Sequence, residues 1–397
     1  MIIEPKIRGF ICLTAHPKGC EQNVINQIDF VKSRKKTSAV KKTLIIGAST
    51  GFGLASRITS AFSSDSPTIG VFFEKPPSQG KPATAGWYNT AAFEEQAHKA
   101  GLYAKSINGD AFSNEIKQKT IELIKADLGQ VDLIIYSLAS PKRIHPVTGY
   151  THSSVIKPIG EVFTNKTVDF HTGIVSSVSI NPATDDEIAN TIAVMGGEDW
   201  AFWIEALKEA GVLANDVLTI AYSYIGPSLT EKVYRQGTIG RAKDHLEATA
   251  GLINEQLKDI NGQAVISVNK ALVTQSSSAI PVIPLYISLL YKVMKSKKLH
   301  EGCIEQIQRL FEQRIFLPKG LPTDVDGRVR IDDWEMRDDV QAEVADLWLA
   351  ADTENLVKIG DLNGYKIDFL NLFGFDLAEV NYEQDVNEMV DIPSLVA

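Results

Sequence analysis

Short runs of apolar, often β-branched residues alternate with longer segments of helical periodicity over much of the chain. The apolar runs lie at residues 43–46, 68–73, 102–105, 132–136, 217–222 and 263–268. Segments with helical spacing of apolar residues separate the first four runs, at residues 54–62, 91–100 and 114–128. Strands that are apolar on both faces are typical of parallel sheets covered by helices. The alternation therefore predicts an α/β fold with a doubly wound, Rossmann-type parallel sheet.

Two segments interrupt the alternation. Residues 75–87 (KPPSQGKPATAGW) are too rich in proline and glycine for a helix and predict a long loop after the second strand. Residues 141–199 combine turn signals with alternating polar and apolar pieces, which predicts a β-hairpin insertion followed by a helix from Asp185. Long segments of this kind in compact domains are usually lids or binding elements. After Lys270 the pattern is mostly helical.

The composition is that of a globular protein and excludes several functional classes. The chain has 397 residues, of which 44% are hydrophobic and 22% charged, and its net charge of −9 argues against a nucleic-acid partner. Three scattered cysteines are too few for a disulfide framework, which favours the cytoplasm. The most apolar stretch, residues 279–294, is too short to cross a bilayer, so we expect no membrane partner. Because the seven histidines are isolated, we expect no catalytic metal.

A glycine-rich turn joins the first apolar run to a helical segment and predicts a dinucleotide site. The turn is Gly47-Ala48-Ser49-Thr50-Gly51-Phe52-Gly53. Glycines let the backbone approach a pyrophosphate, and the amides at the start of the helix favour its negative charge. The second strand ends at Phe73-Glu74, 21 residues after Gly53, and a carboxylate there can bind both adenosine ribose hydroxyls. This favours NADH over NADPH. The turn also fits the Gly-x-Ser-x-Gly motif of hydrolases, but Gly53 and Glu74 have no role in one.

Two tyrosines and a lysine follow the fifth strand. Tyr234 lies ten residues after Tyr224 and nine residues before Lys243. In short-chain reductases a tyrosine hydroxyl meets the substrate oxygen, and a neighbouring lysine binds the nicotinamide ribose and stabilises the tyrosinate. Nine positions turn a helix through about 900°, which leaves the two side chains on opposite faces. Since Gly237 and Gly240 lie between them, we expect Tyr234 on a loop and Lys243 in the helix that follows.

With these motifs the chain resembles a known family, the trans-2-enoyl-CoA and enoyl-[acyl-carrier-protein] reductases of the FabV/TER type. This family is a long-form branch of the short-chain dehydrogenase/reductase superfamily. The resemblance covers nearly the whole chain. It rests on HPKGC at 16–20, GASTGFGLASR at 47–57, TAGWYN at 84–89, VMGGEDW at 194–200, AYSYIGP at 221–227, YRQGTIGRAK at 234–243 and VNKALVT at 268–274.

The resemblance implies an NADH-dependent monomer that reduces the C2=C3 double bond of trans-2-enoyl thioesters on acyl carrier protein or CoA, the final step of fatty acid elongation. Tyr234 would be the proton donor, Lys243 would contact the cofactor, and Tyr224 would contact the substrate thioester. The implied cofactor contacts are Gly47, Ala48, Ser49, Thr50, Gly51, Phe52, Phe73, Glu74, Asp110, Ala111, Leu138, Ala139, Lys243, Leu272, Val273 and Thr274. Asp110 and Leu138 follow the third and fourth strands, so they are expected at the carboxyl edge of the sheet, where ligands bind.

Two alternatives remain open. A 3-ketoacyl or carbonyl reductase on the same fold would use the same Tyr–Lys pair, although Ser137-Leu138-Ala139 replaces the Asn-Ala-Gly common in those enzymes. A catalytically idle NAD-binding sensor would also share the fold.

The spread of the candidate residues bears on domain organisation. They extend from Gly47 to Thr274 without a break between cofactor and substrate groups. We therefore expect one enlarged domain over 1–397. It would have a nucleotide-binding core at 43–275, an insertion at 141–199 and a helical C-terminal part at 279–397.

Overall fold

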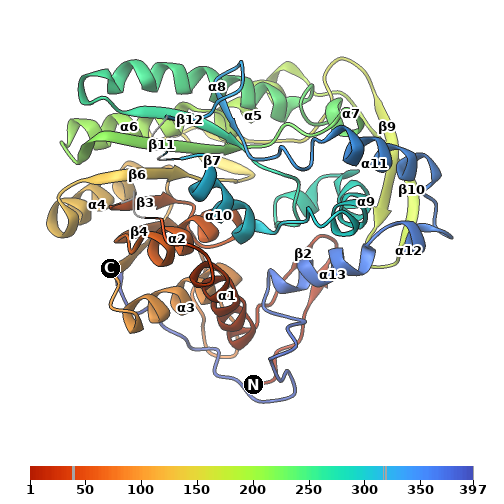
Figure 1. Ribbon diagram of the computed structural model, residues 1–397, viewed down its shortest axis with the longest axis horizontal. Helices are drawn as coiled ribbons and strands as arrows, with labels where there is room; N and C mark the ends of the chain where they lie inside the picture. The colour runs from red at the N-terminus through yellow and green to blue at the C-terminus, as the bar shows by residue number, and fades with distance from the viewer. Residues whose placement is uncertain (38–40, 316, 318–319, 397) are drawn as a thin grey trace.

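A parallel β-sheet forms the centre of the protein in the computed structural model, which describes residues 1–37, 41–315, 317 and 320–396. Within these residues eight strands form one sheet in the order β13-β12-β11-β6-β3-β4-β5-β14, and every neighbouring pair is parallel (Figure 1). The strands are β3 (Thr43–Ile46), β4 (Thr68–Phe72), β5 (Ala104–Asn108), β6 (Val131–Tyr136), β11 (Leu213–Ser223), β12 (Gln263–Val268), β13 (Arg328–Arg330) and β14 (Leu395–Val396). The predicted doubly wound fold is confirmed.

Helices cover both faces of the sheet because successive strand residues point to opposite sides. Ile45 of β3 packs with α1 (Pro17–Lys32), α2 (Gly51–Ser64), α3 (Ala85–Lys99) and α10 (Cys303–Gln313). Its neighbours Leu44 and Ile46 pack on the other face, which is covered by α4 (Asn114–Leu123), a π-helical turn (Ile124–Leu128), α6 (Glu198–Glu209) and α8 (Thr238–Leu257). The all-apolar strands in the sequence thus reflect burial on both sides.

The loop predicted at residues 75–87 is shorter than expected, because α3 already begins at Ala85. Gly86, which belongs to the predicted loop, lies instead in the first turn of α3. A Cβ atom there would lie 2.0 Å from Oε1 of Glu74, so the glycine allows the helix to approach the end of β4.

The insertion at 141–199 contains two hairpins rather than the one predicted. They are β7 (Lys142–Ile144) with β8 (Thr151–Ser153), and β9 (Phe163–Asp169) with β10 (Ile174–Ile180). The helix α5 (Asp185–Met195) follows and begins at the predicted residue, where Thr184 and Glu187 form a capping box.

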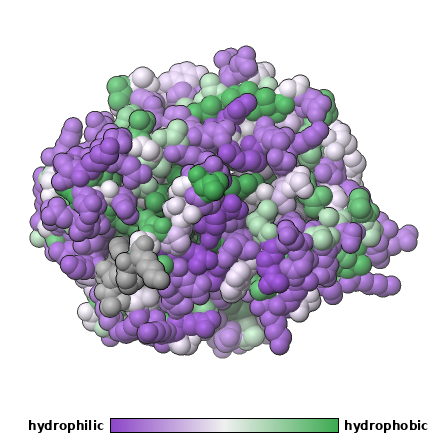
Figure 2. All heavy atoms as spheres, turned by 45° about the horizontal axis from the view of Figure 1, so that its top comes forward, coloured by the Kyte–Doolittle hydropathy of each residue, from purple (hydrophilic) through white to green (hydrophobic). Residues whose placement is uncertain are grey.

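The C-terminal third is helical as predicted, but it also completes both edges of the sheet. Its helices are α9 (Ile283–Ser296), α10, α11 (Asp338–Ala350), α12 (Leu356–Ile359) and α13 (Leu362–Asn371). The remaining elements are β1 (Ile7–Arg8), β2 (Ile11–Cys12), α7 (Ser228–Glu231) and 3₁₀ turns at Lys258–Ile260 and Ser277–Ala279. None of the helices in the described part of the chain has both the length and the apolar composition to cross a membrane. The face shown in Figure 2 is mostly hydrophilic, with scattered hydrophobic residues.

A buried ion pair between two helices also contacts the edge of the sheet that contains β14. Arg57 of α2 and Glu94 of α3 are both fully buried, and Nη2 of Arg57 lies 3.6 Å from Oε1 of Glu94. Oε1 of Glu94 accepts a hydrogen bond from the Ser106 hydroxyl (2.5 Å), and Oε2 accepts one from the backbone N–H of Ser394 (2.7 Å), next to β14. One carboxylate therefore connects α2, α3, β5 and the segment that leads into β14.

We predict that Glu94→Ala lowers the free energy of unfolding by about 3 to 5 kcal/mol, because it leaves a buried guanidinium unpaired. Chemical denaturation followed by circular dichroism measures the change. The matched control is Glu95→Ala, since the neighbouring Glu95 is half exposed and pairs with Lys99 on the surface. Equal, small losses in both variants would show that the buried pair does not stabilise the fold.

Candidate active site

A cavity of about 1120 Å³ lies at the carboxyl edge of the sheet. Its wall contains the residues that end or follow six of the strands, namely β3, β4, β5, β6, β11 and β12. Parallel strands that end at one edge bring such residues together, and ligands of doubly wound sheets bind there. The insertion contributes Lys142 and Arg143 to the wall, and the C-terminal helices contribute Tyr291 and Asp368.

The structure brings nearly all of the predicted site residues into this wall. It contains Tyr224, Tyr234, Gly47, Ser49, Thr50, Gly51, Phe52, Phe73, Glu74, Asp110, Ala111, Leu138, Ala139, Lys243, Leu272, Val273 and Thr274. Ala48 is the exception. Its side chain is fully buried in the core between the sheet and α2, and its backbone N–H donates to the carbonyl of Val71 (3.0 Å). Ala48 therefore contributes packing and not cavity surface.

The glycine-rich turn packs closely against the end of β6. Gly47 has a φ of +91°, and a Cβ on it would lie 2.2 Å from the carbonyl oxygen of Ser137. A Cβ on Gly53 would lie 1.8 Å from the carbonyl oxygen of Gly47. Both glycines are therefore required for the tight turn that starts α2 at Gly51 beside the cavity. A turn of this shape, with the first amides of a helix beside it, suits a pyrophosphate.

Glu74 lies at the end of β4, where a nucleotide ribose would be expected. Its Oε1 accepts a hydrogen bond from the hydroxyl of Ser49 (2.7 Å), and its backbone N–H donates to the side chain of Asn108 (2.8 Å). Burial raises the pKa of Glu74, while hydrogen bonds from Thr84 and Ser49 lower it. Ser49 and Thr84 thus hold the carboxylate, and Asn108 holds the backbone of the same residue.

Tyr224 and Tyr234 face one another in the cavity wall. Their ring centroids are 5.0 Å apart and the rings are inclined at 69°. Tyr224 directly follows β11, and Tyr234 lies between α7 and α8, before the helix that contains Lys243. This is the arrangement that the spacing predicted. Burial raises the pKa of both hydroxyls, so both keep their protons at neutral pH and can act as donors.

Lys243 reaches the same wall from the second turn of α8 and is 9% exposed. Its Nζ donates to the carbonyl of Tyr222 at 3.4 Å. Burial lowers the pKa of Lys243 to about 8, and the charge of Glu247 partly opposes this effect.

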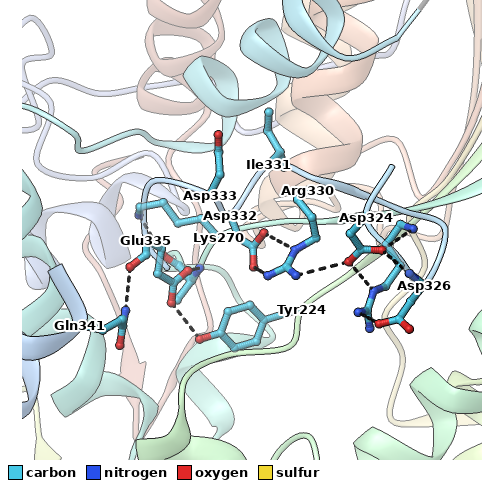
Figure 3. A network of polar contacts seen from close by, with 12 residues as sticks. Tyr224, Lys270, Asp324, Asp326, Arg330, Ile331, Asp332, Asp333, Glu335 and Gln341 are labelled. Carbon is cyan, nitrogen blue, oxygen red and sulfur yellow. Dashed lines mark hydrogen bonds and ion pairs between the residues drawn. The ribbon is translucent and has the colours of Figure 1, made fainter. Parts of the chain in front are cut away.

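A buried acid behind Tyr224 was missed by the sequence reasoning. Oε1 of Glu335 accepts a hydrogen bond from the hydroxyl of Tyr224 (3.1 Å; Figure 3). The same oxygen accepts one from the hydroxyl of Tyr286 (2.7 Å), and Oε2 accepts one from the backbone N–H of Ala271 (2.7 Å). Nothing local distinguishes Glu335, because it lies in a stretch with several other acidic residues. Its contacts come from residues distant in the chain.

Comparison with known proteins identifies the family to which the chain belongs. A family model described as the trans-2-enoyl-CoA reductase catalytic region matches residues 81–316, which is more than half of the chain. A second, described as the NAD(P)H binding domain of trans-2-enoyl-CoA reductase, matches residues 2–79. The chain belongs to the trans-2-enoyl-CoA reductase family. A third model, described as an enoyl reductase FAD binding domain, matches residues 323–386.

Similar proteins span the full length of the chain. An enoyl-[acyl-carrier-protein] reductase [NADH] of Flavobacterium johnsoniae is 71% identical, and a trans-2-enoyl-CoA reductase [NADH] of Ruminiclostridium cellulolyticum is 60% identical, each over 100% of both chains. The crystal structure of Treponema denticola trans-2-enoyl-CoA reductase in complex with NAD is 50% identical. It matches with a TM-score of 0.95 and covers 98% of this chain and 99% of the Treponema chain. The predicted family is therefore confirmed.

Residues 323–386 do not fit a flavin site of their own. All of them are described, and they form β13 followed by α11, α12 and α13. They contain no glycine-rich turn between a strand and a helix, and they reach the large cavity only at Asp368, Asn371 and Leu372. The segment also supplies Glu335 behind Tyr224, and we derive no step through a flavin.

The buried ammonium of Lys243 should reduce stability, and we predict that Lys243→Met raises the free energy of unfolding. The lowered pKa of about 8, against an ordinary value of 10.5, corresponds to a gain of up to about 3 kcal/mol below pH 8. Between the two values the unfolded chain binds more protons, so the stability of the unsubstituted protein rises with pH and the advantage of methionine shrinks. Urea denaturation across this pH range measures both effects.

The control for this substitution is Lys232→Met, because Lys232 is exposed and pairs with Glu161 at the surface. A loss of stability in Lys243→Met at neutral pH would contradict the prediction.

Proposed function

We propose that this protein reduces the C2=C3 double bond of trans-2-enoyl thioesters with NADH, the final step of the fatty acid elongation cycle. The observation that carries the proposal is the pair of protonated hydroxyls of Tyr224 and Tyr234, which share one cavity wall with a dinucleotide turn. The family and the names of the full-length relatives support the same reaction.

The residues of the wall fit a dinucleotide. The turn from Gly47 to Phe52 would hold the pyrophosphate, and Glu74 would hold the adenosine ribose and repel a 2′-phosphate. Lys243 would contact the nicotinamide ribose, and the remaining cofactor contacts would be Phe73, Asp110, Ala111, Leu138, Ala139, Leu272, Val273 and Thr274. Bound NADH supplies the hydride that adds to the β-carbon of the substrate.

The two tyrosines would stabilise the negative charge that develops in the reaction, and one of them would supply the proton. Addition of a hydride to the β-carbon leaves negative charge on the thioester oxygen as an enolate. Hydroxyls of Tyr224 and Tyr234 directed at that oxygen would stabilise this charge. Tyr234 would then provide the proton that ends on the α-carbon, so that one hydride and one proton saturate the bond. Lys243 would stabilise the tyrosinate electrostatically.

All three predicted parts of the chain contribute residues to the cavity wall, which supports a single functional unit. Residues from the core at 43–275, the insertion at 141–199 and the C-terminal part at 279–397 all line it. We therefore propose one enlarged domain over 1–397, active as a monomer in the cytoplasm. Size-exclusion chromatography with light scattering tests the oligomeric state.

Tyr234→Phe should lower kcat by about 100-fold to 1,000-fold, because it removes the proton donor and one hydrogen bond to the enolate oxygen. NADH binding, measured by fluorescence quenching, should be unchanged. The control is Tyr103→Phe, since the hydroxyl of Tyr103 is bound to Asp127 outside the cavity wall. Full activity in Tyr234→Phe would rule out its assigned role.

A substrate panel separates the proposed reaction from its two alternatives. We expect NADH oxidation with crotonyl-CoA or with a long trans-2-enoyl thioester of acyl carrier protein, and none with a 3-ketoacyl thioester. The ratio of kcat/KM between the first two identifies the natural carrier. Oxidation with the 3-ketoacyl thioester alone would favour a ketoreductase, and no oxidation with any of them would favour a sensor.

A further inference from the structure

Glu335 holds two tyrosine hydroxyls and one backbone amide in a fully buried position. It lies between β13 and α11 and is 0% exposed. One oxygen contacts the hydroxyls of Tyr224 and Tyr286, and the other contacts the N–H of Ala271, the residue before the cofactor stretch 272–274. Figure 3 shows Glu335 and Tyr224 pointing toward one another from different segments.

The carboxyl group of Glu335 has only neutral donors. Within the described residues, no lysine or arginine forms an ion pair of 4.0 Å or less with it. Lys270, whose charge acts on Glu335, donates to the carbonyl of Ala271 instead (2.9 Å). Burial raises the pKa of Glu335, and the charge of Asp332 adds to this, whereas Lys270, Tyr286 and the amide of Ala271 lower it. Glu335 is therefore a buried acid that can hold or release its proton without losing an ion pair.

The proton of Tyr286 has a fixed direction. Its oxygen accepts a hydrogen bond from Nε2 of Gln341 (3.1 Å), and its own proton is directed to Glu335. Nε2 of Gln341 also donates to the backbone carbonyl of Glu335 (2.8 Å), which holds the amide in this orientation. Tyr286 is fully buried and is not part of the cavity wall, so substrate cannot compete for its proton.

Tyr224 differs from Tyr286 because it faces both Glu335 and the cavity. A phenol has one proton to donate. When Glu335 is ionised, Tyr224 must give that proton to the carboxylate, and none remains for a substrate oxygen. When Glu335 is protonated, the carboxyl group can donate to the oxygen of Tyr224, and the Tyr224 proton is free to point into the cavity.

We propose that Glu335 is a positioning residue that controls, through its own proton, whether the Tyr224 hydroxyl can donate to the substrate oxygen. This inference rests on the function proposed above. Glu335 does not touch the substrate, and it acts through the direction of one hydrogen bond. The protonated form is the active one.

The decisive variant is Glu335→Gln. The amide oxygen of the glutamine can accept from the N–H of Ala271. Its NH₂ group can no longer accept from Tyr286 but donates to Tyr224, so the Tyr224 proton points into the cavity at every pH. We expect kcat of the unsubstituted enzyme to fall as pH rises through the pKa of Glu335, toward the roughly 100-fold loss typical of one missing donor. The glutamine variant should lack this fall. A uniform decrease of kcat at all pH values would show a merely structural role and overturn the proposal.

A second set of variants, made in protein that already carries Tyr224→Phe, separates the effect of Glu335 from that of other groups that titrate near the site. Lys243 and Lys270 have pKa values lowered to about 8, and their effect on kcat should be common to both proteins. In a Tyr224→Phe background, Glu335→Gln should leave the pH profile unchanged, because the residue through which it acts is gone. The same change of profile in both backgrounds would contradict the assignment.

Asp332→Asn provides the matched control. Asp332 lies in the same segment and is 1% exposed, but it pairs with Arg330 (2.6 Å) and not with Tyr224. Its variant keeps Glu335, so the fall of kcat with pH should persist. It should move to lower pH, since the charge of Asp332 raises the pKa of Glu335. Loss of the fall in this variant would show that the effect is not specific to Glu335.

A measurement without substrate distinguishes failure of this inference from failure of the proposed function. In protein labelled with ¹³C at the tyrosine ring carbon that bears the hydroxyl, the Tyr224 signal, assigned with Tyr224→Phe, should shift with pH and lose this shift in Glu335→Gln. If no enoyl thioester is reduced but the signal still titrates, the proposed function is wrong and the coupling is right. If turnover occurs and the signal does not titrate, the coupling is wrong.

Should Glu335→Gln fail to fold, Tyr286→Phe tests the same point. It removes a hydrogen bond that lowers the pKa of Glu335, so the fall of kcat should move to higher pH. An unchanged position, or a move to lower pH, would overturn the proposal.

Discussion

The loop that follows β12 is largely buried at the cavity wall, and its backbone amides need acceptors within the protein. Three of these amides find acceptors of different kinds. The N–H of Asn269 donates to the carbonyl of Ser223 (2.8 Å), that of Ala271 to Glu335 (2.7 Å), and that of Val273 to the hydroxyl of Tyr291 (3.3 Å). Tyr291 in turn donates to Asp368 (2.7 Å). Because this loop is part of the cavity wall, these bonds help to set the shape of the site.

The C-terminal third therefore supports the site from behind. Tyr286 and Tyr291 come from α9, whose apolar residues form the centre of the largest buried cluster. Glu335 and Asp368 reach the same loop from segments beyond it. The added helices thus fix the backbone of the loop that lines the site. This support also accounts for a segment that matches a flavin-domain model yet contributes hydrogen-bond acceptors and packing.

The sequence predicted those parts of the structure that are set by neighbouring residues. Six strands, the glycine-rich turn and the loop position of Tyr234 all followed from local periodicity and from the geometry of a helix. The edge strands β13 and β14 did not, because strands of three and two residues leave no periodic signal. Glu335 was also missed, since the 111 residues that separate it from Tyr224 make the contact a property of the fold. The loop was predicted to extend to residue 87 because the close approach of Gly86 to Glu74, which allows the helix to begin earlier, is not visible in the sequence.

Lys243 and Lys270, both buried in the cavity wall with pKa values of about 8, have a further consequence. Around pH 8 each is only partly charged when no ligand is bound. A negatively charged ligand stabilises the charged form of a nearby amine, so its binding draws protons from the solution. Ligand affinity near this pH then depends on the concentration of protons as well as on the contacts. The heat of binding likewise includes the ionisation enthalpy of the buffer that releases them.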